Sequence, residues 1–386
     1  MSSSIAGDRP PPVRVVIAPD SFKGSITAAA AASALAHGWR SVRPDDELVL
    51  RPMADGGEGT LDAFATAVPG ARRIPLSVTG PEDTPIETAW LLLPQTDAAS
   101  NGTGVVELAS TSGIELLGSP PRLRPLDAHT LGLGEAIAAA LAHGVSQLVV
   151  GIGGSASTDG GAGLLTALGA RLTDAADRPV PAGGRGLADI ARVDLSALPT
   201  PPAGGVTVLG DVTNPLLGPT GAAVVFAPQK GADPAAVIAL EAGLARLARF
   251  VDVPPGSPGA GAAGGTGFAL LAWGARIVPG ASAVADLIGL GDALAGASVV
   301  LTGEGSFDGQ SAAGKVPSHV AGLAAAAGVP AALVAGRIAP GAPTDGFAAS
   351  VSLTGLAGSS AAAMRDPARW IAAAAARLAG KVGGSR

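Results

Sequence analysis

Two acidic, glycine-dense segments contain the residue types best suited to chemistry in this chain. They are Asp55-Gly56-Gly57-Glu58-Gly59 and Gly303-Glu304-Gly305-Ser306-Phe307-Asp308, and each follows a short apolar run typical of a strand. Glycine lets the backbone approach a ligand and offer N–H donors, whereas carboxylates hold metal ions or accept protons. The combination favours a phosphorylated, magnesium-bound ligand over a purely apolar pocket.

A third segment, Asp20-Ser21-Phe22-Lys23-Gly24-Ser25, joins an expected strand to an expected helix that Ser25 would cap. A helix N-terminus offers free N–H groups to a phosphate, and Lys23 would add a full charge. The alternative is an ordinary capped turn with a solvated lysine. We favour a functional site because Asp20 and Lys23 share one strand-end loop.

Two further strand ends carry candidate ligand-binding residues. In the run from Gly151 to Gly161, the small residues suit a backbone cradle for phosphate, and the alternative is a tight strand–helix turn. In the segment from Gly210 to Pro215, acid and amide oxygens could ligate Mg²⁺ or orient a hydroxyl, and the alternative is an Asx turn before the proline. The candidates are Gly153, Gly154, Ser155, Asp159, Asp211 and Asn214.

Two glycine patterns imitate nucleotide-binding motifs. The run from Gly309 to Lys315 has P-loop spacing, but Val316 replaces the metal-binding Ser or Thr and no strand leads directly into it. We expect no true P-loop and keep Lys315 as a point-charge contact to phosphate. The run from Gly259 to Gly264 matches the dinucleotide fingerprint, but proline and glycine precede it, so we reject that site.

The four histidines have no metal-ligand spacing. His37 and His143 each precede a glycine at an expected helix end, which favours structural roles, while His129 and His319 stay open as functional candidates.

Composition excludes several classes of protein. The chain of 386 residues is 47% hydrophobic and 15% charged with net charge −6, which is typical of a compact globular protein and not of a nucleic-acid or membrane-surface binder. It contains no cysteine, so disulfides and thiolate chemistry are excluded, and a cytoplasmic location is compatible with this. We expect small-molecule partners and a monomer or small homo-oligomer.

Short β-branched runs alternate with alanine-rich helical stretches, which predicts an α/β fold. The expected strands span residues 13–18, 47–51, 72–79, 86–93, 104–108, 148–152, 206–209, 298–302 and 331–335. The closely spaced middle strands indicate a second, more antiparallel or mixed domain. We therefore expect a flexible leader over residues 1–12, a discontinuous Rossmann-like domain of residues 13–79 and 286–386, and an inserted α/β domain of residues 80–285.

Taken together, these segments resemble the type I glycerate kinase family over nearly the whole chain after residue 12. The family is a group of ATP-dependent kinases of D-glycerate, with two α/β domains, one inserted in the other, and an active site in the cleft between them. The segments that carry the resemblance are residues 17–25, 52–60, 151–163, 211–216, 226–232, 261–268 and 302–315. Ser306, Thr158 and Leu133 depart from the family pattern, which has arginine, asparagine and threonine at these places.

The resemblance implies an active site that transfers a phosphoryl group by positioning and charge neutralisation. Mg²⁺ with ATP is the expected cofactor, held by Asp55, Asp211 and Asp308. Asp211 is the first choice to orient the glycerate hydroxyl or accept its proton. Lys23, with the Gly153–Ser155 amides, would stabilise phosphate charge.

The remaining expected binding residues are Asp20, Ser21, Asp159, Asn214 and Glu304. Lys23 or Lys315 would meet the glycerate carboxylate. The resemblance suggests the 2-hydroxyl as acceptor, giving 2-phosphoglycerate, and attack from the 3-hydroxyl stays open. The alternatives are a non-catalytic sugar-acid sensor and a hydroxy-acid oxidoreductase, which is disfavoured by the misplaced fingerprint at Gly259.

Overall fold

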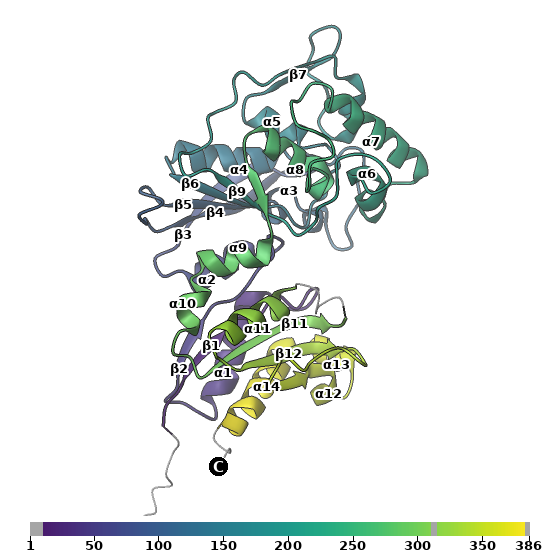
Figure 1. The fold of residues 1–386 in the computed structure, drawn as a ribbon. Helices are drawn as coiled ribbons and strands as arrows, with labels where there is room; N and C mark the ends of the chain where they lie inside the picture. The colour runs from purple at the N-terminus through teal and green to yellow at the C-terminus, as the bar shows by residue number, and fades with distance from the viewer. Residues whose placement is uncertain (1–10, 310–314, 383–386) are drawn as a thin grey trace, which may run out of the picture. The chain divides into compact units, whose positions relative to one another are not determined.

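The structure, a computed structural model, describes residues 11–309 and 315–382, which fall into two compact units (Figure 1). The described residues through Ala54 and from Val284 onward form the first unit, and Asp55–Ala283 form the second. The expected leader up to residue 10 and residues 310–314 of the P-loop-like segment lie outside the described residues.

The first unit is built on an all-parallel sheet. Its strands lie in the order β13-β12-β11-β1-β2, and every pairing is parallel. The elements are β1 (Arg14–Ile17), α1 (Ala28–Arg40), β2 (Glu47–Leu50), α10 (Leu290–Leu294), β11 (Val299–Phe307), α11 (Val316–Ala326), β12 (Ala331–Ile338), β13 (Ala349–Ser352), α12 (Leu353–Ala357), α13 (Ser360–Arg365) and α14 (Pro367–Val382).

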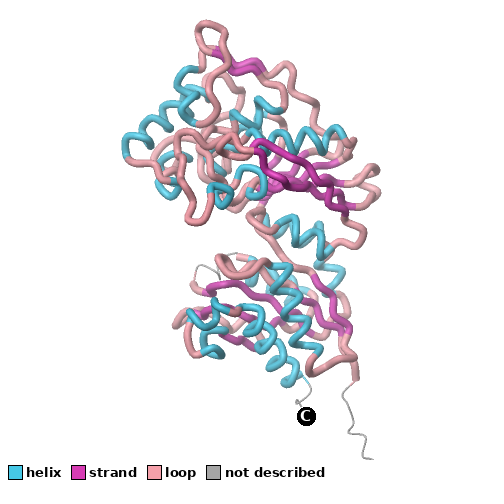
Figure 2. Tube along the Cα trace, turned by 180° about the vertical axis from the view of Figure 1, so that it is seen from behind, coloured by secondary structure: helices cyan, strands magenta, loops and turns pink. Residues whose placement is uncertain are grey.

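Helices cover both faces of this sheet, as Figure 2 shows. α1 packs against α14, and Gly38 allows the close approach, because a Cβ there would lie 2.0 Å from the carbonyl oxygen of Ala372. From β1 the chain continues to β2 at one edge of the sheet, whereas from β11 it continues through β12 to β13 at the opposite edge. Right-handed crossovers therefore place α1 and α11 on opposite faces, and the strand order reverses between β1 and β11.

The second unit contains a mixed six-stranded sheet in the order β10-β9-β6-β5-β4-β3. β5, β6, β9 and β10 pair in parallel, whereas β3 and β4 continue the sheet antiparallel, and β7 with β8 forms a separate antiparallel pair. The strands are β3 (Arg72–Thr79), β4 (Pro85–Leu93), β5 (Thr103–Glu107), β6 (Gln147–Gly151), β7 (Arg171–Thr173), β8 (Arg192–Asp194), β9 (Val206–Leu209) and β10 (Arg276–Val278).

Helices and short 3₁₀ turns complete the second unit, and α9 continues from it into the first. They are α2 (Thr60–Ala67), α3 (Ala109–Ser112), η1 (Ile114–Leu117), α4 (Leu131–Ala142), α5 (Ala162–Ala167), η2 (Gly184–Asp189), α6 (Ala222–Phe226), η3 (Pro228–Lys230), α7 (Pro234–Leu247), α8 (Ala262–Ala272) and α9 (Gly280–Leu287). The expected α/β class, with a parallel sheet and a mixed sheet, is confirmed.

The division into compact units differs from the expected boundary at residues 79 and 80. Residues 55–79 group with the second unit. β3 pairs with β4 over its whole length, from Arg72 opposite Leu92 to Thr79 opposite Pro85, so it cannot be separated from that sheet. That each unit is an independently folding domain remains a prediction.

Two local expectations are wrong. Thr27 and not Ser25 caps α1, because its Oγ1 accepts the N–H of Ala30 at 3.3 Å. The segment from Gly303 to Phe307 is not a loop but the second half of β11, which pairs with β12 as far as Phe307 opposite Ile338.

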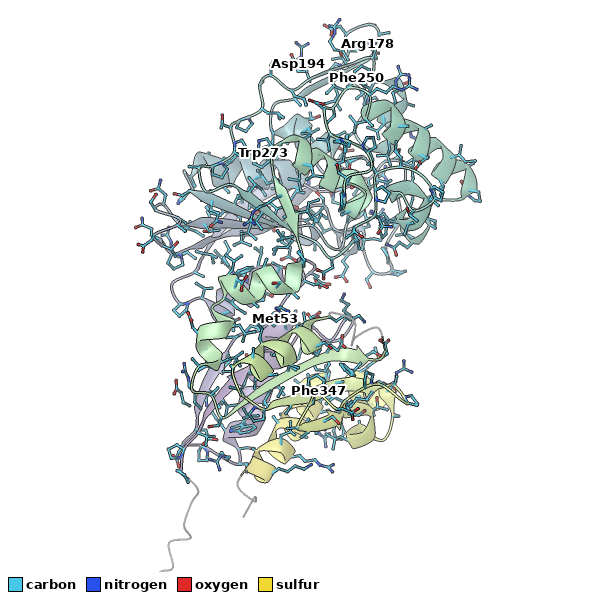
Figure 3. All side chains as sticks on the ribbon, viewed as in Figure 1. Met53, Arg178, Asp194, Phe250, Trp273 and Phe347 are labelled. Carbon is cyan, nitrogen blue, oxygen red and sulfur yellow. The ribbon has the colours of Figure 1, made fainter. Side chains whose placement is uncertain are left out.

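β11 extends because its last residue is anchored in the core of the first unit. The Phe307 ring is fully buried and meets the Phe347 ring edge to face, with centroids 5.6 Å apart. Phe347 is labelled in Figure 3. In the described part of the chain, no helix has both the length and the apolar character needed to cross a membrane.

Candidate active site

In the first unit, polar residues gather at the carboxyl ends of β1 and β11. Ligands of open parallel sheets bind where the strand order reverses, and these two strands flank that point. The N–H of Asp20, after β1, donates to the carbonyl oxygen of Gly303 at 2.8 Å. A Cβ on Gly305 would lie 3.3 Å from the backbone nitrogen of Lys23, so the extended β11 runs directly beside the Asp20–Lys23 turn.

A tight turn fixes how this segment is presented. The N–H groups of Phe22 and Ile26 donate to each other's carbonyl oxygens at 2.9 and 3.1 Å, and the Phe22 ring is buried in the core. The N–H of Ser21 donates to Oδ1 of Asp20 at 2.7 Å. Lys23 is therefore exposed at the tip of the turn, while Asp20 lies largely buried beneath it.

The remaining candidates of this unit follow from β11. Glu304 is buried within the strand, beside the Asp20 turn, and Asp308 is half-buried just after it. Lys315 is exposed and is the N-cap residue of α11, whose first turn contains Pro317. The structure thus brings Asp20, Ser21, Lys23 and Glu304 together. Asp308 and Lys315 are separated along the chain by a segment that includes residues 310–314, which lie outside the described residues.

In the second unit, the four parallel strands end at one edge of the sheet. Glu107 ends β5, Gly153 follows β6, Asp211 follows β9 and Gly280 follows β10. The parallel arrangement brings together residues that lie far apart in the sequence.

The Asp55 loop packs across this edge through backbone contacts. The N–H of Gly153 donates to the carbonyl oxygen of Gly56 at 2.9 Å, and a Cβ on Gly153 would lie 2.5 Å from the Cα of Gly57. Gly56 has φ +93°, and a Cβ there would lie 2.5 Å from the carbonyl oxygen of Leu209. The packing of these loops against each other therefore requires glycine at these positions, whether or not the same glycines also let the backbone approach a ligand.

Asp55 and Asp211 meet at Gly280. The N–H of Gly280 donates to Oδ1 of Asp211 at 2.7 Å, and a Cβ on Gly280 would lie 2.1 Å from the carbonyl oxygen of Asp55. The Asp55 side chain accepts the N–H of Gly57 at 3.0 Å. Gly280 thus contacts the carboxylate of Asp211 and lies against the backbone of Asp55, which are two of the three residues predicted to hold metal and come from different loops.

The loop after β6 is anchored by Asp159. This carboxylate is fully buried and accepts hydrogen bonds from the N–H groups of Gly161 and Gly163 and from both N–H and Oγ1 of Thr130, at 2.8–3.2 Å. Asp159 fixes the loop, and its predicted contact with phosphate stays a prediction. Gly154 is exposed and Gly153 half-exposed.

Asn214 also holds its own loop, because its amide Nδ2 donates to the carbonyl oxygen of Thr220 at 2.8 Å. The rejected fingerprint from Gly259 to Gly264 is a packing segment: a Cβ on Gly261 would lie 2.2 Å from the carbonyl oxygen of Pro215, and one on Gly264 would lie 2.1 Å from that of Ser157.

Lys230, at the end of η3, was missed by the sequence reasoning. Its side chain is buried, and Nζ donates to Oγ of Ser155 at 3.1 Å and to the carbonyl oxygen of Ser157. Burial lowers the pKa of the Lys230 ammonium to about 8, although the charge of Asp159 acts in the opposite sense. The sequence signal that could have identified Lys230 is its position between Gln229 and a glycine, shortly after an apolar run.

Glu107 was also missed, although a glutamate within the apolar run of residues 104–108 is unusual. Its two carboxylate oxygens accept the N–H groups of Gly59 at 2.9 Å and Leu61 at 3.1 Å. Burial raises the pKa of the Glu107 carboxyl to about 7, against the lowering effect of these two hydrogen bonds. Glu107 therefore ties the Asp55 loop and the start of α2 to β5.

Two of the four histidines make side-chain contacts with residues outside these loops. The His143 ring packs edge to face on Trp90, with centroids 5.3 Å apart, and His37 lies in the last turn of α1. His129 is buried, with Nε2 3.1 Å from Oδ1 of Asp83. His319, half-buried in α11, stays open.

Two of the three departures from the family pattern lie in the interior of the second unit. Leu133 is fully buried in its apolar core. Thr158 is also fully buried, and among the described residues its Oγ1 has no hydrogen-bond partner. Ser306 lies in β11 opposite Arg337 of β12.

Comparisons with known proteins agree with this architecture. The chain matches the model of the glycerate kinase family over residues 15–382. It is 41% identical over 320 residues to the glycerate 2-kinase of Escherichia coli (strain K12), covering 81% of this chain and 82% of that protein. It is 40% identical over 334 residues to the glycerate kinase of Halalkalibacterium halodurans, covering 85% and 86%.

A crystal structure of a glycerate kinase 2 from Salmonella typhimurium LT2 superposes with a TM-score of 0.81 at 36% identity, covering 96% of this chain and 98% of that one. The fold, the acidic strand-end loops and these matches define an α/β kinase that uses ATP. The chain belongs to the glycerate kinase family.

Proposed function

We propose that this kinase transfers the γ-phosphoryl group of ATP to the 2-hydroxyl of D-glycerate, giving 2-phosphoglycerate and ADP. The observation that carries the proposal is the convergence of Asp55 and Asp211 on Gly280, which sets two acids at one strand-end edge. The name of the Escherichia coli relative, a glycerate 2-kinase, supports the choice of the 2-hydroxyl.

The donor atoms of this edge suit Mg²⁺. Among the described residues no group of three or more His, Cys, Asp or Glu could hold a metal ion. Mg²⁺ commonly takes only one or two protein carboxylates and keeps water and substrate phosphates as its other ligands. Asp55 and Asp211 would supply the carboxylates, with Asp308 as a further candidate. When bound, Mg²⁺ would neutralise charge on the nucleotide phosphates.

Asp211 has the central catalytic role in this proposal. The N–H of Gly280 orients its carboxylate. Asp211 would orient the glycerate hydroxyl for in-line attack and accept its proton, a function that asks for a fixed carboxylate within hydrogen-bond reach of the hydroxyl.

Cations and backbone donors would bind the anionic parts of the substrates. Lys23, exposed at the tip of its turn, and the amides of Gly153 and Gly154 suit phosphate oxygens. Lys23 or Lys315 would meet the glycerate carboxylate. Asp20, Ser21, Ser155, Asp159, Asn214 and Glu304 complete the proposed binding set. A cytoplasmic location and a monomer or small homo-oligomer remain predictions.

A magnesium-dependent ATP assay with D-glycerate, with the product identified by phosphorus NMR, tests the proposal. We expect 2-phosphoglycerate, and we expect EDTA to abolish turnover and added Mg²⁺ to restore it. Formation of 3-phosphoglycerate would keep the kinase and overturn the acceptor hydroxyl. Full activity after metal removal would overturn the roles of the three aspartates as metal ligands.

A further inference from the structure

A positively charged side chain lies buried directly beneath the loop that follows β6. Lys230 is 3% exposed, and its Nζ reaches Oγ of Ser155 and the carbonyl oxygen of Ser157 from inside the unit. Gly154, on the same loop, is exposed to solvent. The loop therefore has an outer side open to a ligand and an inner side that contacts an ammonium group.

This ammonium has no carboxylate at salt-bridge distance among the residues that the structure describes. The charged group that acts on it is Asp159, and that carboxylate already accepts four hydrogen bonds from the backbone and from Thr130. A desolvated cation without a paired anion is costly to a fold, and an apolar residue of similar volume would be tolerated better. Packing alone gives no reason for a lysine here.

Ser155 connects the buried charge to the loop surface. Its Oγ accepts hydrogen bonds from Lys230 Nζ and from the N–H of Ser157 at 3.3 Å, and it lies 3.3 Å from the carbonyl oxygen of Ala263. These contacts fix the hydroxyl and anchor Ser155, which directly follows Gly153 and Gly154 in the chain, against the ammonium. In a low-dielectric interior such a charge acts strongly on an anion bound above it.

We propose that Lys230 is a positioning residue that supplies, through Ser155, the positive charge for an oxyanion of a substrate bound on the Gly153–Ser155 loop. The oxyanion is either a nucleotide phosphate or the carboxylate of the acceptor acid, because both groups carry negatively charged oxygens. The inference rests on the proposed function in one respect, namely that this loop faces a substrate.

The test measures binding of MgADP and of D-glycerate separately by calorimetry, together with thermal unfolding. The variants are Lys230→Met, Lys230→Arg and Ser155→Ala, and Lys381→Met is the matched control because that lysine is exposed on α14. We expect Lys230→Met to weaken one of the two ligands by about tenfold or more, Lys230→Arg to restore part of the affinity, and the control to bind as the wild type does. The ligand affected identifies the oxyanion.

Stability separates a binding role from a purely structural one. Because burial lowers the pKa of Lys230 from 10.5 to about 8, the unfolded chain binds more protons than the folded chain between these values. The contribution of this group to stability therefore rises with pH in that window, and it is least favourable below pH 8. We expect Lys230→Met to unfold at the wild-type Tm or above it at pH 7 while binding its ligand more weakly.

Binding of both ligands by a folded Lys230→Met variant within twofold of the wild type would overturn the inference. If that variant does not fold, Ser155→Ala decides: unchanged affinities for both ligands would also overturn it. The failure of the proposed function looks different, because then the wild type makes no 2-phosphoglycerate while the binding measurements still report on Lys230.

Discussion

The backbone N–H of Gly280 donates a 2.7 Å hydrogen bond to Oδ1 of Asp211. Gly280 is the first residue of α9, so the carboxylate lies at the positive end of a helix, where negative charge is favoured. A Cβ on the same glycine would lie 2.1 Å from the carbonyl oxygen of Asp55. One glycine therefore orients the carboxylate of Asp211 and packs against the backbone of Asp55, from a different loop.

Asp211→Asn tests the catalytic role of this carboxylate. The amide oxygen can still accept the Gly280 N–H, so the loop keeps its shape, but the proton acceptor is lost. We expect kcat to fall by about 10²–10⁴-fold, the range for loss of a positioned general base. Steady-state kinetics and a Tm within error of the wild type check this.

Asp194→Asn is the matched control, because Asp194 ends β8 and accepts the N–H of Ser196 in a local turn at 2.9 Å (Figure 3). It should leave kcat unchanged. A kcat for Asp211→Asn within a few fold of the wild type would show that Asp211 is not the base.

Gly280→Ala tests the backbone contact. The new methyl group would lie 2.1 Å from the carbonyl oxygen of Asp55, so the Asp55 loop must shift. We expect a loss of about 1–3 kcal/mol in the free energy of unfolding and a fall in kcat/KM of about tenfold or more. Denaturant unfolding and kinetics measure the two effects.

Gly291→Ala is the control, because a Cβ there would meet nothing within 4 Å. Both glycines lie in helices, so replacement by alanine adds the same helix-propensity gain of about 1 kcal/mol to the free energy of unfolding in both variants. Gly291→Ala should therefore be neutral or stabilising. Equal behaviour of the two variants would contradict the contact.

Glu107→Gln tests the tie between β5 and the Asp55 loop. An amide group would set a donor against one of the two N–H groups of Gly59 and Leu61, which costs about 1–3 kcal/mol for a buried donor left unpaired. We expect lower stability and a lower kcat/KM.

The pH dependence of this effect has a defined sign. The pKa of Glu107 is raised by burial from 4.5 to about 7, and Asp62 and Glu58 add to the rise. The folded chain binds more protons than the unfolded chain in that window, so the contribution of Glu107 to stability falls as pH rises from 4.5 to 7. The Tm difference between wild type and Glu107→Gln should therefore shrink over this range, while Glu87→Gln, exposed on β4, should show no such trend. A constant difference would mean that Glu107 stays charged throughout.

Thr158→Val tests the buried hydroxyl in the loop after β6. The Thr158 side chain is fully buried, and among the described residues its Oγ1 lacks a partner, so an isosteric methyl group should raise the free energy of unfolding by about 1 kcal/mol. Thr266→Val is the control, since that buried Oγ1 donates to the carbonyl oxygen of Ala263 at 2.8 Å and its loss should destabilise. A loss of stability in both variants would reveal a partner for Thr158.

The sequence by itself determined many of the elements and the family. β3 and β9 span the predicted residues, because β-branched runs and glycine boundaries are local signals. The order of the acidic and glycine-rich segments was enough to identify the resemblance to glycerate kinases, which the family match over residues 15–382 confirms.

Only the tertiary structure decided which of these residues act together. β11 extends through Glu304 because β12 and the Phe347 ring hold it, and neither neighbour is visible in the local sequence. The convergence of Asp55 and Asp211 depends on a glycine after β10, and the burial of Lys230 depends on the loop after β6 folding over it. Such contacts join residues distant in the chain, so local periodicity contains no record of them, whereas the parallel sheet brings their strand ends to one edge.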